Sequence, residues 1–529
     1  MGLYLNPGNE EFRNAAIHSK IYVDKTEMIK FTNSQLFGEH KNICVSRPRR
    51  FGKSMAANML VAYYSKGCDS KELFQNYKIA GDSSFKEHLN KYNVIHLNIQ
   101  QFLGRTDTIH EMLDMLSRKV IRELKREFAD VTYYEEDLVS VIEEIYAQTH
   151  SFFVFIIDEW DCIFRVKGED TEAQKLYLNF LRDLLKNQPY CILAYMTGIL
   201  PIKKYGEHSA LNMFDEYSMT NQRELAEFTG FTEQEVQELC PQYDMSYDKM
   251  KQWYDGYDLK GIQIYNPRSV VMSLLGHDFD SYWTKTETYE ALKKYIQMDM
   301  YNLKELVTRL IAGSSIEINP DKFQNDMTTF ASADDVLTLL VHLGYLTYDF
   351  DTATVRIPNQ EVQKEFINCI EDGGWEPVMD AIRKSEELLA ATIHGEEETV
   401  ARMIENAHQE NTSILAYNDE NSLACVISLA YYSAKKNYVV YRELAGGKGF
   451  ADMVFVPRKT TQTPAIVVEL KWNKTAEAAI TQIKRKQYVE SLKDYRGEVI
   501  LVGINYDSKE LEKDDYKKHS CKIERITMA

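Results

Sequence analysis

Apolar residues in the first 200 positions fall into short runs that are separated by amphipathic segments. The runs occupy residues 42–45, 152–157 and 191–196, and residues 93–99 show the alternation of a further strand. Continuous apolar runs of this length are typical of buried strands in a parallel sheet. The intervening segments 54–65 and 107–128 carry apolar residues at helical spacing. Strands that alternate with helices predict an α/β fold with a parallel sheet.

The pattern becomes mostly helical between residues 220 and 375. A helix over 334–343 is expected to end at Gly344, and alternating residues at 345–348 and 353–357 predict a two-stranded hairpin. A helix followed by a hairpin forms the last part of a winged-helix unit. A general α+β lid fits the same pattern equally well, and the sequence does not decide between them.

The last part of the chain begins with an amphipathic helical segment at 381–407, which we interpret as a connector. Beyond it the pattern predicts a helix at 422–434, strands at 438–442, 452–456 and 465–470, a helix at 475–492 and a strand at 498–504. Because 529 residues are too many for one hydrophobic core, we expect four parts. They are a P-loop domain (1–220), a helical lid or winged-helix-like region (221–375), a helical connector (376–409) and a C-terminal α/β domain (410–529).

Composition adds three expectations. The hydrophobic fraction of 44% and the charged fraction of 27% are those of a soluble globular protein. The eight cysteines are scattered without a CxxC pair, the N-terminus is polar, and no apolar run reaches a membrane-spanning length, so we expect a cytoplasmic protein with no membrane association. The net charge of −18 argues against nucleic-acid binding over the whole surface but leaves room for a local basic channel.

A candidate phosphate-binding loop follows the first apolar run. The segment RPRRFGKS (47–54) fits the pattern GxxxxGK[ST], except that Arg47 stands at the first glycine. Backbone N–H groups of such a loop and the N-terminus of the next helix bind phosphates. Lys53 would contact the β- and γ-phosphates, and Ser54 would ligate Mg²⁺. The candidate ATP-binding residues of the loop are Arg50, Phe51, Gly52, Lys53 and Ser54.

Two further polar positions follow later strands. Asp158 and Glu159 come at the end of the run FFVFII, and Thr197 ends the run CILAYM. Asp158 would hold the Mg²⁺ of ATP, and Glu159 would polarise the attacking water. Thr197 would sense the γ-phosphate. Three such features in this order predict an ATP site, although the site could bind ATP and hydrolyse it slowly or not at all.

A second constellation lies in the C-terminal domain. Asp452 and Glu469 are separated by sixteen residues, and Lys471 follows two positions later, on what we expect to be two adjacent strands. Residues two apart in a strand share a face, so Glu469 and Lys471 point the same way. Two carboxylates are ligands that Mg²⁺ prefers, and Lys471 would orient or deprotonate a water. Mn²⁺ would serve at the same place.

Neighbouring residues support this second site. Glu420 begins the preceding helix, and Glu443 ends a strand. The helix after Lys471 carries Gln482 and Tyr488 in the run QIKRKQY, whose three basic residues would meet a phosphate backbone. A solvated charged face explains that run as well.

The N-terminal motifs resemble those of the bacterial and archaeal AAA-ATPase-like proteins that are often fused to a predicted nuclease. The resemblance is carried by YVDKT (22–26), SRPRRFGKS (46–54), IIDEWD (156–161), MTGI (196–199) and WYDGY…YNPRSV (253–270). It covers nearly the whole chain and implies a P-loop ATPase fold. In that family RPRRFGKS is the usual form of the loop, so Arg47 is a family trait.

The C-terminal order of helix-Glu, strand, GxxD, ExK strand and helix with Q…Y resembles the PD-(D/E)XK nuclease superfamily. The resemblance implies an active site of Glu420, Asp452, Glu469 and Lys471, with Gln482 supporting. Ala451 replaces the usual proline, a common departure. It implies nucleic acid, DNA or RNA, as a partner of the C-terminal domain, and the N-terminal motifs imply ATP.

Other motif residues remain unassigned. Trp253 and Tyr257 are expected in a core, or at a substrate or inter-domain contact. Arg182, Arg223 and Arg268 are all candidates for an arginine that contacts the γ-phosphate. The oligomeric state is open. Our interpretation is an ATP-binding and ATP-hydrolysing protein with a metal-dependent nuclease domain. The alternative is a signalling or scaffold ATPase whose nuclease-like domain binds without cutting.

Overall fold

The structure is a computed structural model of the chain. It describes residues 2–202, 211–221, 225–283, 287–297, 301–325, 327–411, 420–446, 449–458, 463–488, 492, 495–507 and 518–528. The chain divides into two compact units. The first comprises Met1–Leu292 and Glu317–Glu365, and the second comprises Lys293–Ile316 and Phe366–Ala529. Each unit is therefore discontinuous in sequence.

A five-stranded sheet forms the centre of the N-terminal part of the first unit. Its strands are β1 (Asn42–Ser46), β2 (Asn93–Asn98), β3 (Phe153–Asp158), β4 (Cys191–Gly198) and β5 (Asp215–Tyr217). Their order in the sheet is β2-β3-β4-β1-β5, and every pairing is parallel. The predicted parallel α/β sheet is thus present, and β4 lies between the strand of the phosphate loop and the strand of Asp158.

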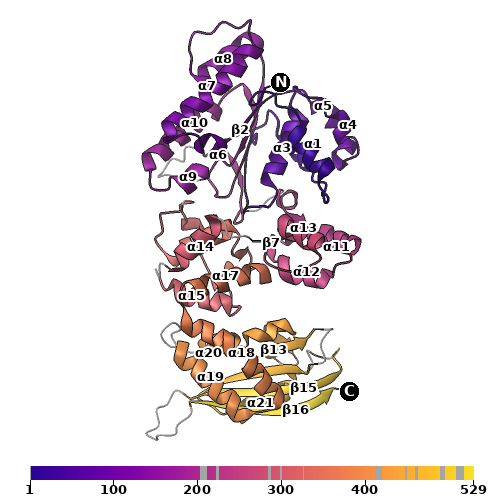
Figure 1. The fold of residues 1–529 in the computed structure, drawn as a ribbon, viewed down its shortest axis with the longest axis vertical. Coiled ribbons are helices and arrows are strands. Elements are labelled where there is room, and N and C mark those ends of the chain that lie inside the picture. The colour runs from indigo at the N-terminus through magenta and orange to yellow at the C-terminus, as the bar shows by residue number, and fades with distance from the viewer. Residues whose placement is uncertain are drawn as a thin grey trace. The chain divides into compact units, whose positions relative to one another are not determined.

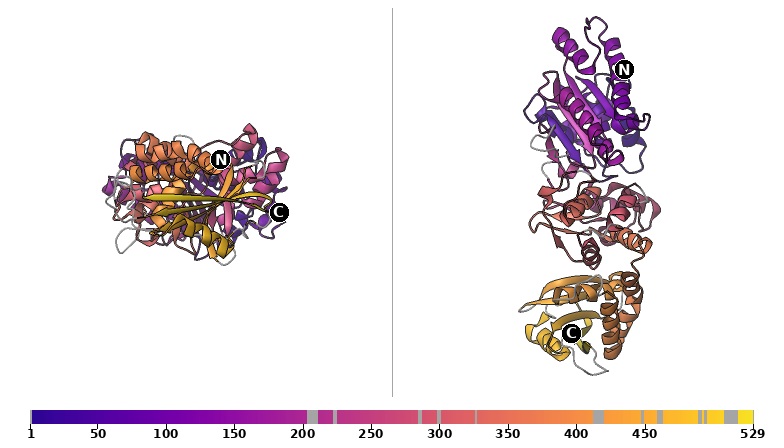
Figure 2. Two further views of the ribbon diagram at one scale, coloured as in Figure 1. Left: turned by 90° about the horizontal axis from the view of Figure 1, so that it is seen from below. Right: turned by 90° about the vertical axis from the view of Figure 1, so that its left-hand side faces the viewer.

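Helices flank this sheet (Figures 1 and 2). The helix α3 packs on it most closely, and Ala57, Leu60, Tyr63 and Tyr64 are fully buried. The helical elements of this part are α1 (Glu10–His18), α2 (Met28–Gln35), α3 (Lys53–Tyr64), α4 (Lys71–Phe74), η1 (Lys78–Gly81), α5 (Phe85–His88), α6 (Ile99–Leu103), α7 (Ile109–Glu127), α8 (Leu138–Thr149), α9 (Cys162–Val166) and α10 (Thr171–Leu185).

The middle region is mainly helical with three short strands paired at its start. A capping box at Ser332 begins the helix α16, and Gly344 ends it with a φ of 87°, as the sequence predicted. The elements here are η2 (Ala226–Phe228), β6 (Phe231–Thr232), α11 (Glu233–Gln242), α12 (Tyr247–Tyr254), β7 (Tyr257–Leu259), β8 (Ile262–Tyr265), α13 (Pro267–Gly276), α14 (Glu287–Gln297), α15 (Leu303–Ile311), β9 (Ile316–Glu317), η3 (Pro320–Lys322), α16 (Ala333–Leu343), β10 (Thr347–Asp349), β11 (Thr354–Arg356) and α17 (Gln360–Asp372). The strands β10 and β11 pair antiparallel as the expected hairpin.

The second unit contains a mixed five-stranded sheet of order β12-β13-β14-β15-β16, in which only β14 and β15 pair parallel among the described residues. The elements are α18 (Glu376–His394), α19 (Glu397–Asn411), α20 (Glu420–Ala430), η4 (Tyr432–Lys436), β12 (Tyr438–Gly446), β13 (Gly449–Pro457), β14 (Ala465–Trp472), α21 (Ala476–Lys486), β15 (Gly497–Tyr506) and β16 (His519–Met528). In the left view of Figure 2 the sheet is seen edge-on, with orange helices on one side and a yellow helix on the other.

Three features of the second unit differ from the sequence-based expectation. The segment expected as a helical connector consists of two helices, because Gly395 ends α18 with a φ of 81°. The helix α21 ends at Lys486, since Gln487 adopts a left-handed conformation. The strand β16, which pairs with β15 over its full length, was not predicted. The expected fold class is confirmed: the chain has a parallel α/β sheet, a mainly helical middle region and a C-terminal α/β domain.

Among the described residues, none of the helices has the length and apolar character that would let it cross a membrane.

Candidate functional site

The phosphate loop joins β1 to α3 and ends at a left-handed glycine. Gly52 is the N-cap of α3 with a φ of 88°, and Arg50 also has a positive φ of 70°. The side chain of Lys53 is buried, and its Nζ donates to the carbonyl oxygens of Arg47, at 3.0 Å, and Pro48, at 2.9 Å. Two of the three ammonium donors are used in this way, which fixes the side chain inside the loop.

Arg47 occupies the position of the missing glycine without entering the loop. Its side chain is fully buried, and Nη1 donates to the carbonyl oxygens of Ser46, at 2.9 Å, and Tyr217, at 2.7 Å. The side chain thus fastens the loop to the edge strand β5. Its φ is not positive, so this position does not need the conformational freedom of glycine.

Asp158 and Thr197 meet at the carboxyl ends of neighbouring strands. The register pairs Ile157 with Met196, which brings the next residues together, and the Thr197 hydroxyl donates to Asp158 Oδ1. The same oxygen accepts the backbone N–H of Glu159 at 3.0 Å. Both side chains are buried. Thr197 is also paired with Val45 of β1, so β4 connects the two halves of the site.

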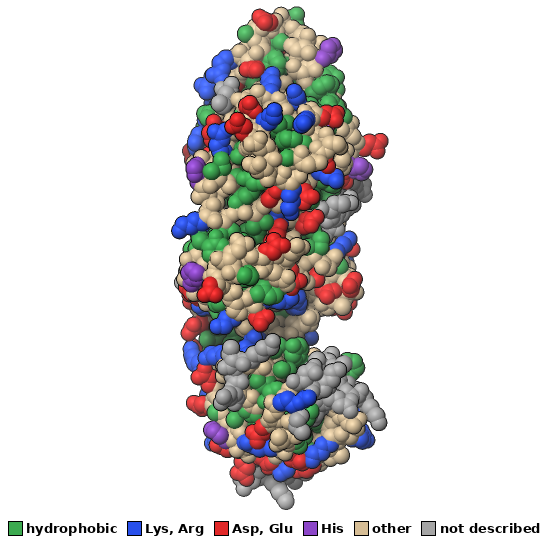
Figure 3. Space-filling model, turned by 90° about the vertical axis from the view of Figure 1, so that its right-hand side faces the viewer, with side chains coloured by type: hydrophobic (Ala, Val, Ile, Leu, Met, Phe, Trp, Pro, Cys, Tyr) green, Lys and Arg blue, Asp and Glu red, His purple; other side chains and the backbone are tan. Residues whose placement is uncertain are grey.

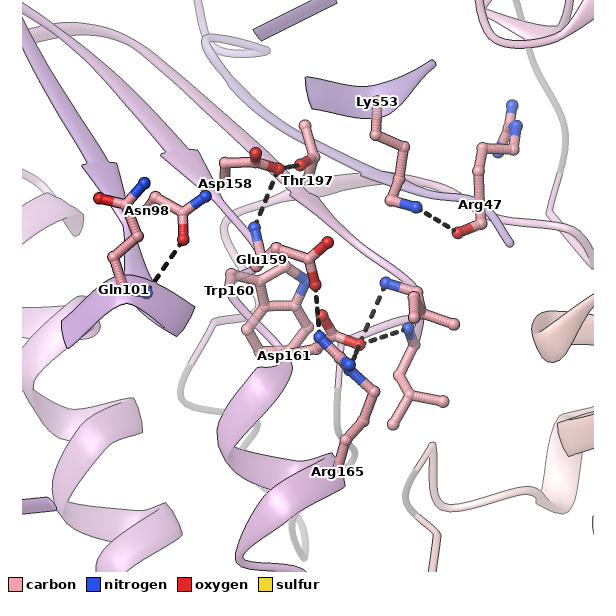
Figure 4. A network of polar contacts seen from close by, with 12 residues as sticks. Arg47, Lys53, Asn98, Gln101, Asp158, Glu159, Trp160, Asp161, Arg165 and Thr197 are labelled. Carbon is pink, nitrogen blue, oxygen red and sulfur yellow. Dashed lines mark hydrogen bonds and ion pairs between the residues drawn. The ribbon is translucent and has the colours of Figure 1, made fainter. Parts of the chain in front are cut away.

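Arg165 bridges the carboxylates of Glu159 and Asp161 (Figure 4). Its Nη2 donates to Glu159, and its Nε donates to Asp161 Oδ2 at 3.2 Å. Asp161 Oδ2 also accepts the backbone N–H groups of Ile199, at 3.0 Å, and Leu200, at 2.8 Å. Glu159 has a φ of 54°, a conformation that non-glycine residues adopt mainly where the surroundings impose it.

Burial and charge act in opposite directions on the titratable groups here. Burial lowers the pKa of Lys53, while Glu159, Asp161 and Asp158 oppose that change. Burial raises the pKa of Glu159, while Lys53 and Arg165 oppose it. The Lys53 ammonium therefore lies within electrostatic reach of all three carboxylates, which is the arrangement that a cation–phosphate complex needs.

A cavity of about 640 Å³ opens at the phosphate loop. This volume is within the range of about 300–1,000 Å³ that small-molecule sites occupy. Gly52, Lys53, Ser54 and Glu159 line one part of it. Apolar side chains line the remainder and come from the segment 21–23, from 228–231 and from α13: Ile21, Tyr22, Val23, Phe228, Phe231, Val271 and Met272. Apolar walls beside a phosphate loop suit a nucleotide base.

The three arginines considered from the sequence lie in different places. Arg268, at the start of α13, lines the cavity, together with Arg49 and Arg50. Burial and the charges of Arg268 and Arg49 lower the pKa of Arg50, so these guanidinium groups lie close together. Arg182 instead donates to Asp183 on an exposed face of α10, at 3.0 Å. Arg223 lies outside the described residues.

The two middle motifs have structural roles that the sequence left open. Asn266 caps α13 by accepting the N–H of Arg268 at 3.0 Å, which sets that arginine at the helix start. The Tyr257 hydroxyl donates to the carbonyl oxygen of Gly344 at 2.7 Å, and its ring packs edge-on against Phe51 of the phosphate loop. A side chain at Gly256 would collide with the Pro358 carbonyl. Trp253 packs beside the buried core of this region.

The second constellation assembles on one face of the C-terminal sheet. Continuing the antiparallel register, in which Met453 pairs with Val468, places Asp452 opposite Glu469. The backbone N–H of Leu470 donates to Asp452 Oδ2 at 2.6 Å. Both carboxylates share the face with Val454 and Val467, which pack against α21.

Lys471 and α21 complete this group. Lys471 Nζ donates to Glu469 Oε1 at 2.7 Å and to the Leu470 carbonyl oxygen at 2.8 Å. Gln482 donates to the same oxygen of Glu469 and to the Tyr488 hydroxyl, the latter at 3.1 Å. Burial raises the pKa of Tyr488, and Glu469 and Asp452 raise it further. The concentrated negative charge and the oxygen donors fit a divalent hard cation.

Two sequence-based candidates near this group cannot be placed. Glu420 begins α20 and Glu443 lies in β12, but their side chains lie outside the described residues. Two exposed aromatic side chains were not predicted. Phe450 is 64% exposed and Tyr441 is 43% exposed. Tyr441 pairs with Val454, so both aromatics share the face of Asp452.

The fold is that of a P-loop-type domain with a C-terminal nuclease-type domain. Residues 7–206 match the family described as predicted AAA-ATPase, and residues 418–516 match the PD-(D/E)XK nuclease superfamily. The chain therefore carries an AAA-ATPase-like domain followed by a PD-(D/E)XK nuclease-superfamily domain. The recognition made from the motifs is confirmed.

Several relatives share parts of the chain. An uncharacterized protein in the vnfD 5′ region of Azotobacter chroococcum is 23% identical over 283 residues, 50% of this chain and 51% of its own. A STAND signal-transduction ATPase with a tetratricopeptide-repeat sensor from Pyrococcus horikoshii is 11% identical, covering 78% of this chain and 50% of its own with a TM-score of 0.27. The chain thus spans about half the length of each of these relatives.

The Aeropyrum pernix ORC2 protein, solved in ADPNP and ADP complexes, is 10% identical and covers 69% of this chain and 93% of its own, with a TM-score of 0.27. At TM-scores this low, the structural likenesses do not bear on function.

Proposed function

We propose that the chain binds and hydrolyses ATP·Mg²⁺ in its N-terminal domain and uses nucleotide state to control a metal-dependent cleavage of nucleic-acid phosphodiesters in its C-terminal domain. The observation that carries the proposal is the group of Asp452, Glu469, Lys471 and Gln482 on one face of the C-terminal sheet. Two carboxylates beside a buried lysine are costly to assemble, and their joint use in chemistry explains the arrangement.

In the ATPase half, the chain's own residues bind and orient the nucleotide. Two donors of Lys53 are used within the loop. The third would bind the phosphates, and the N–H groups at the start of α3 would contribute further donors. Ser54 and Asp158 would hold the Mg²⁺, which would neutralise charge on the phosphates when bound. Glu159, kept in position by Arg165, takes the proton of the attacking water. Arg268 contacts the nucleotide from the other side of the cavity.

In the nuclease half, Asp452 and Glu469 would hold the divalent cation, which would supply charge stabilisation at the phosphate when bound. Lys471 is positioned by Glu469 and by the Leu470 carbonyl, and it orients the attacking water or takes its proton. Gln482 holds the orientation of Glu469, and Tyr488 holds that of Gln482. Mg²⁺ and Mn²⁺ both suit these oxygen donors.

The aromatic side chains of Tyr441 and Phe450 indicate how a substrate strand is held. Unpaired bases stack on exposed aromatic rings, with about 1–3 kcal/mol per base. Because both rings share the face of Asp452, a single-stranded segment that stacks on them passes the carboxylates. Acidic and basic side chains are interspersed on the face drawn in Figure 3. A local stacking contact therefore matters more for substrate binding than the overall net charge.

The deciding experiment incubates the full chain with labelled DNA and RNA, single- and double-stranded, with Mg²⁺ or Mn²⁺, and with and without ATP. Cleavage that is lost in Asp452→Ala and in Lys471→Ala supports the proposal. Glu498→Ala is the matched control, because Glu498 is a carboxylate of the same sheet that pairs with Arg525. Cleavage that survives both active-site variants contradicts the assignment.

The net charge of −18 favours the second function, a signalling or scaffold ATPase whose C-terminal domain binds without cutting. Binding of labelled nucleic acid without cleavage by the wild-type chain, under every metal condition, supports that function. Phe450→Ala then tests the stacking contact, with Tyr134→Ala, an exposed aromatic of the first unit, as the control. Roughly tenfold weaker binding of single strands is expected for Phe450→Ala alone.

A further inference from the structure

A second cluster of potential metal ligands lies in the C-terminal unit, away from the carboxylate pair. Glu405 and His408 are one turn apart on α19, so their side chains share a helix face. His519, the first residue of β16, lies opposite them. The ligand atoms of these three residues lie within 4.8 Å of one another.

The three side chains are held in mutual contact. His519 Nδ1 lies 2.5 Å from Glu405 Oε2, which also accepts the backbone N–H of His519 at 3.1 Å. The rings of His408 and His519 are 5.1 Å apart and nearly perpendicular. Gln409 donates to the other oxygen of Glu405 at 2.9 Å and fixes the carboxylate. Ligands that are oriented by further hydrogen bonds in this way are typical of metal sites.

The burial and the ligand types of the cluster suit a transition metal. Both histidine side chains are buried, and Glu405 is partly exposed, which leaves a path from solvent. Imidazole nitrogens and carboxylate oxygens are both ligands that transition metals accept in proteins.

We propose that Glu405, His408 and His519 bind a Zn²⁺ ion. Two imidazole nitrogens and one carboxylate oxygen form a mixed set that Zn²⁺ and related transition metals accept, whereas Mg²⁺ prefers oxygen ligands and water. A tetrahedral Zn²⁺ with bonds of about 2.0–2.2 Å separates its ligand atoms by roughly 3–3.5 Å. Small side-chain shifts reach that arrangement from the observed one, with water as the fourth ligand.

The position of the cluster gives the ion a structural role. Tyr506 packs on the rings of both His408 and His519, at 5.0 and 4.9 Å, and Trp472 packs on Tyr506 at 4.6 Å. Trp472 directly follows Lys471 in β14, on the opposite face of the sheet. An ion bound here ties α19 to the strand end that carries Lys471 while remaining separate from the carboxylate pair.

The test measures Zn²⁺ itself. The full-length chain is stripped with a chelator, dialysed and titrated with Zn²⁺ in competition with a chromophoric chelator, and the bound metal is counted by mass spectrometry. One tightly held Zn²⁺ per chain is expected in the wild type and in Asp452→Asn. It should be lost in His408→Ala and His519→Ala. At about 100 times Kd, Zn²⁺ should raise the Tm of the C-terminal unit by about 5–10 °C.

Two variants guard against misfolding and non-specific binding. Glu405→Gln keeps the size and hydrogen-bonding capacity of the side chain, so it should fold with the wild-type metal-free Tm and still lose most of the Zn²⁺ affinity. His394→Ala, an exposed histidine at the end of α18, should retain the ion. Zn²⁺ that stays bound in His408→Ala and Glu405→Gln, or that is lost in Asp452→Asn instead, overturns the proposal. In that outcome the cluster acts only as a hydrogen-bonded contact between α19 and β16.

Discussion

Lys53 Nζ lies 3.0 Å from the carbonyl oxygen of Arg47, the residue that stands where the usual phosphate-loop pattern has a glycine. The contact uses the backbone of Arg47, which any residue supplies, and the Arg47 side chain is directed to Tyr217 of β5. A departure that looks damaging in the sequence therefore leaves the lysine in place and adds a link to the sheet edge. This relationship underlies the first prediction.

Replacement of Lys53 by alanine should weaken ATP binding roughly ten- to hundredfold, because a charge-assisted hydrogen bond of about 1.5–3 kcal/mol is lost. Isothermal titration calorimetry with a non-hydrolysable analogue measures the change. Lys71→Ala, an exposed lysine at the start of α4, is the control and should bind as the wild type does. Equal ATP affinity in Lys53→Ala and the wild type would show that the phosphate loop does not bind the nucleotide.

Glu159→Gln should leave ATP affinity unchanged and slow hydrolysis by about 10²–10⁴-fold, since only the acceptor of the water's proton is lost. Steady-state phosphate release and binding are measured on the same preparation. The glutamine retains the size of Glu159 and can still accept from Arg165. An unchanged hydrolysis rate would show that another group activates the water.

Arg268 and Arg182 provide a matched pair for the arginine question. Arg268 lines the cavity at the phosphate loop, whereas Arg182 is exposed and paired with Asp183. Arg268→Ala should reduce ATP affinity or hydrolysis at least tenfold, and Arg182→Ala should change neither. The reverse result would indicate that Arg182 acts in a second copy of the chain.

Glu361 makes the stability of the first unit depend on pH. Burial raises the pKa of Glu361 to about 7, although it accepts from Ser269, at 3.0 Å, and from the backbone of Tyr282, at 2.7 Å. A carboxyl with a raised folded-state pKa binds more protons when folded than when unfolded, so its contribution falls as pH rises from about 4.5 to 7. The loss amounts to about 3 kcal/mol.

Glu361→Gln should therefore stabilise the unit at pH 8 relative to the wild type and make little difference at pH 4.5. Thermal melting of both proteins across this pH range measures the growing gap. A constant difference in Tm at all pH values would show that Glu361 does not titrate in the folded protein.

The packing of α18 and α19 predicts the result of limited proteolysis. Both helices pack with α20, and α19 packs on β16. A stable C-terminal fragment should begin before residue 376 and contain roughly 150 residues. The sequence-based boundary at 410 predicts a fragment of roughly 120 residues. N-terminal sequencing of the fragment distinguishes the two boundaries.

Local patterns in the sequence determined the class of this protein. Buried parallel strands appear in the sequence as continuous apolar runs, and polar residues follow these runs. Lys53, Asp158 and Thr197 could therefore be identified from the sequence alone. The two-residue period of a strand likewise placed Glu469 and Lys471 on one face. Both patterns involve residues that are close together in the sequence. For this reason the family could be recognised from the sequence motifs.

Only the tertiary structure decided which distant residues meet. The order β2-β3-β4-β1-β5 sets Thr197 beside Asp158, and the pairing of β12 with β13 brings Tyr441 to the face of Asp452. Arg268 lines the cavity and Arg182 does not, although the sequence alone did not distinguish them. His519 reaches Glu405 across 114 positions. Contacts over such separations depend on strand order and helix packing, which leave no periodic signal in the chain.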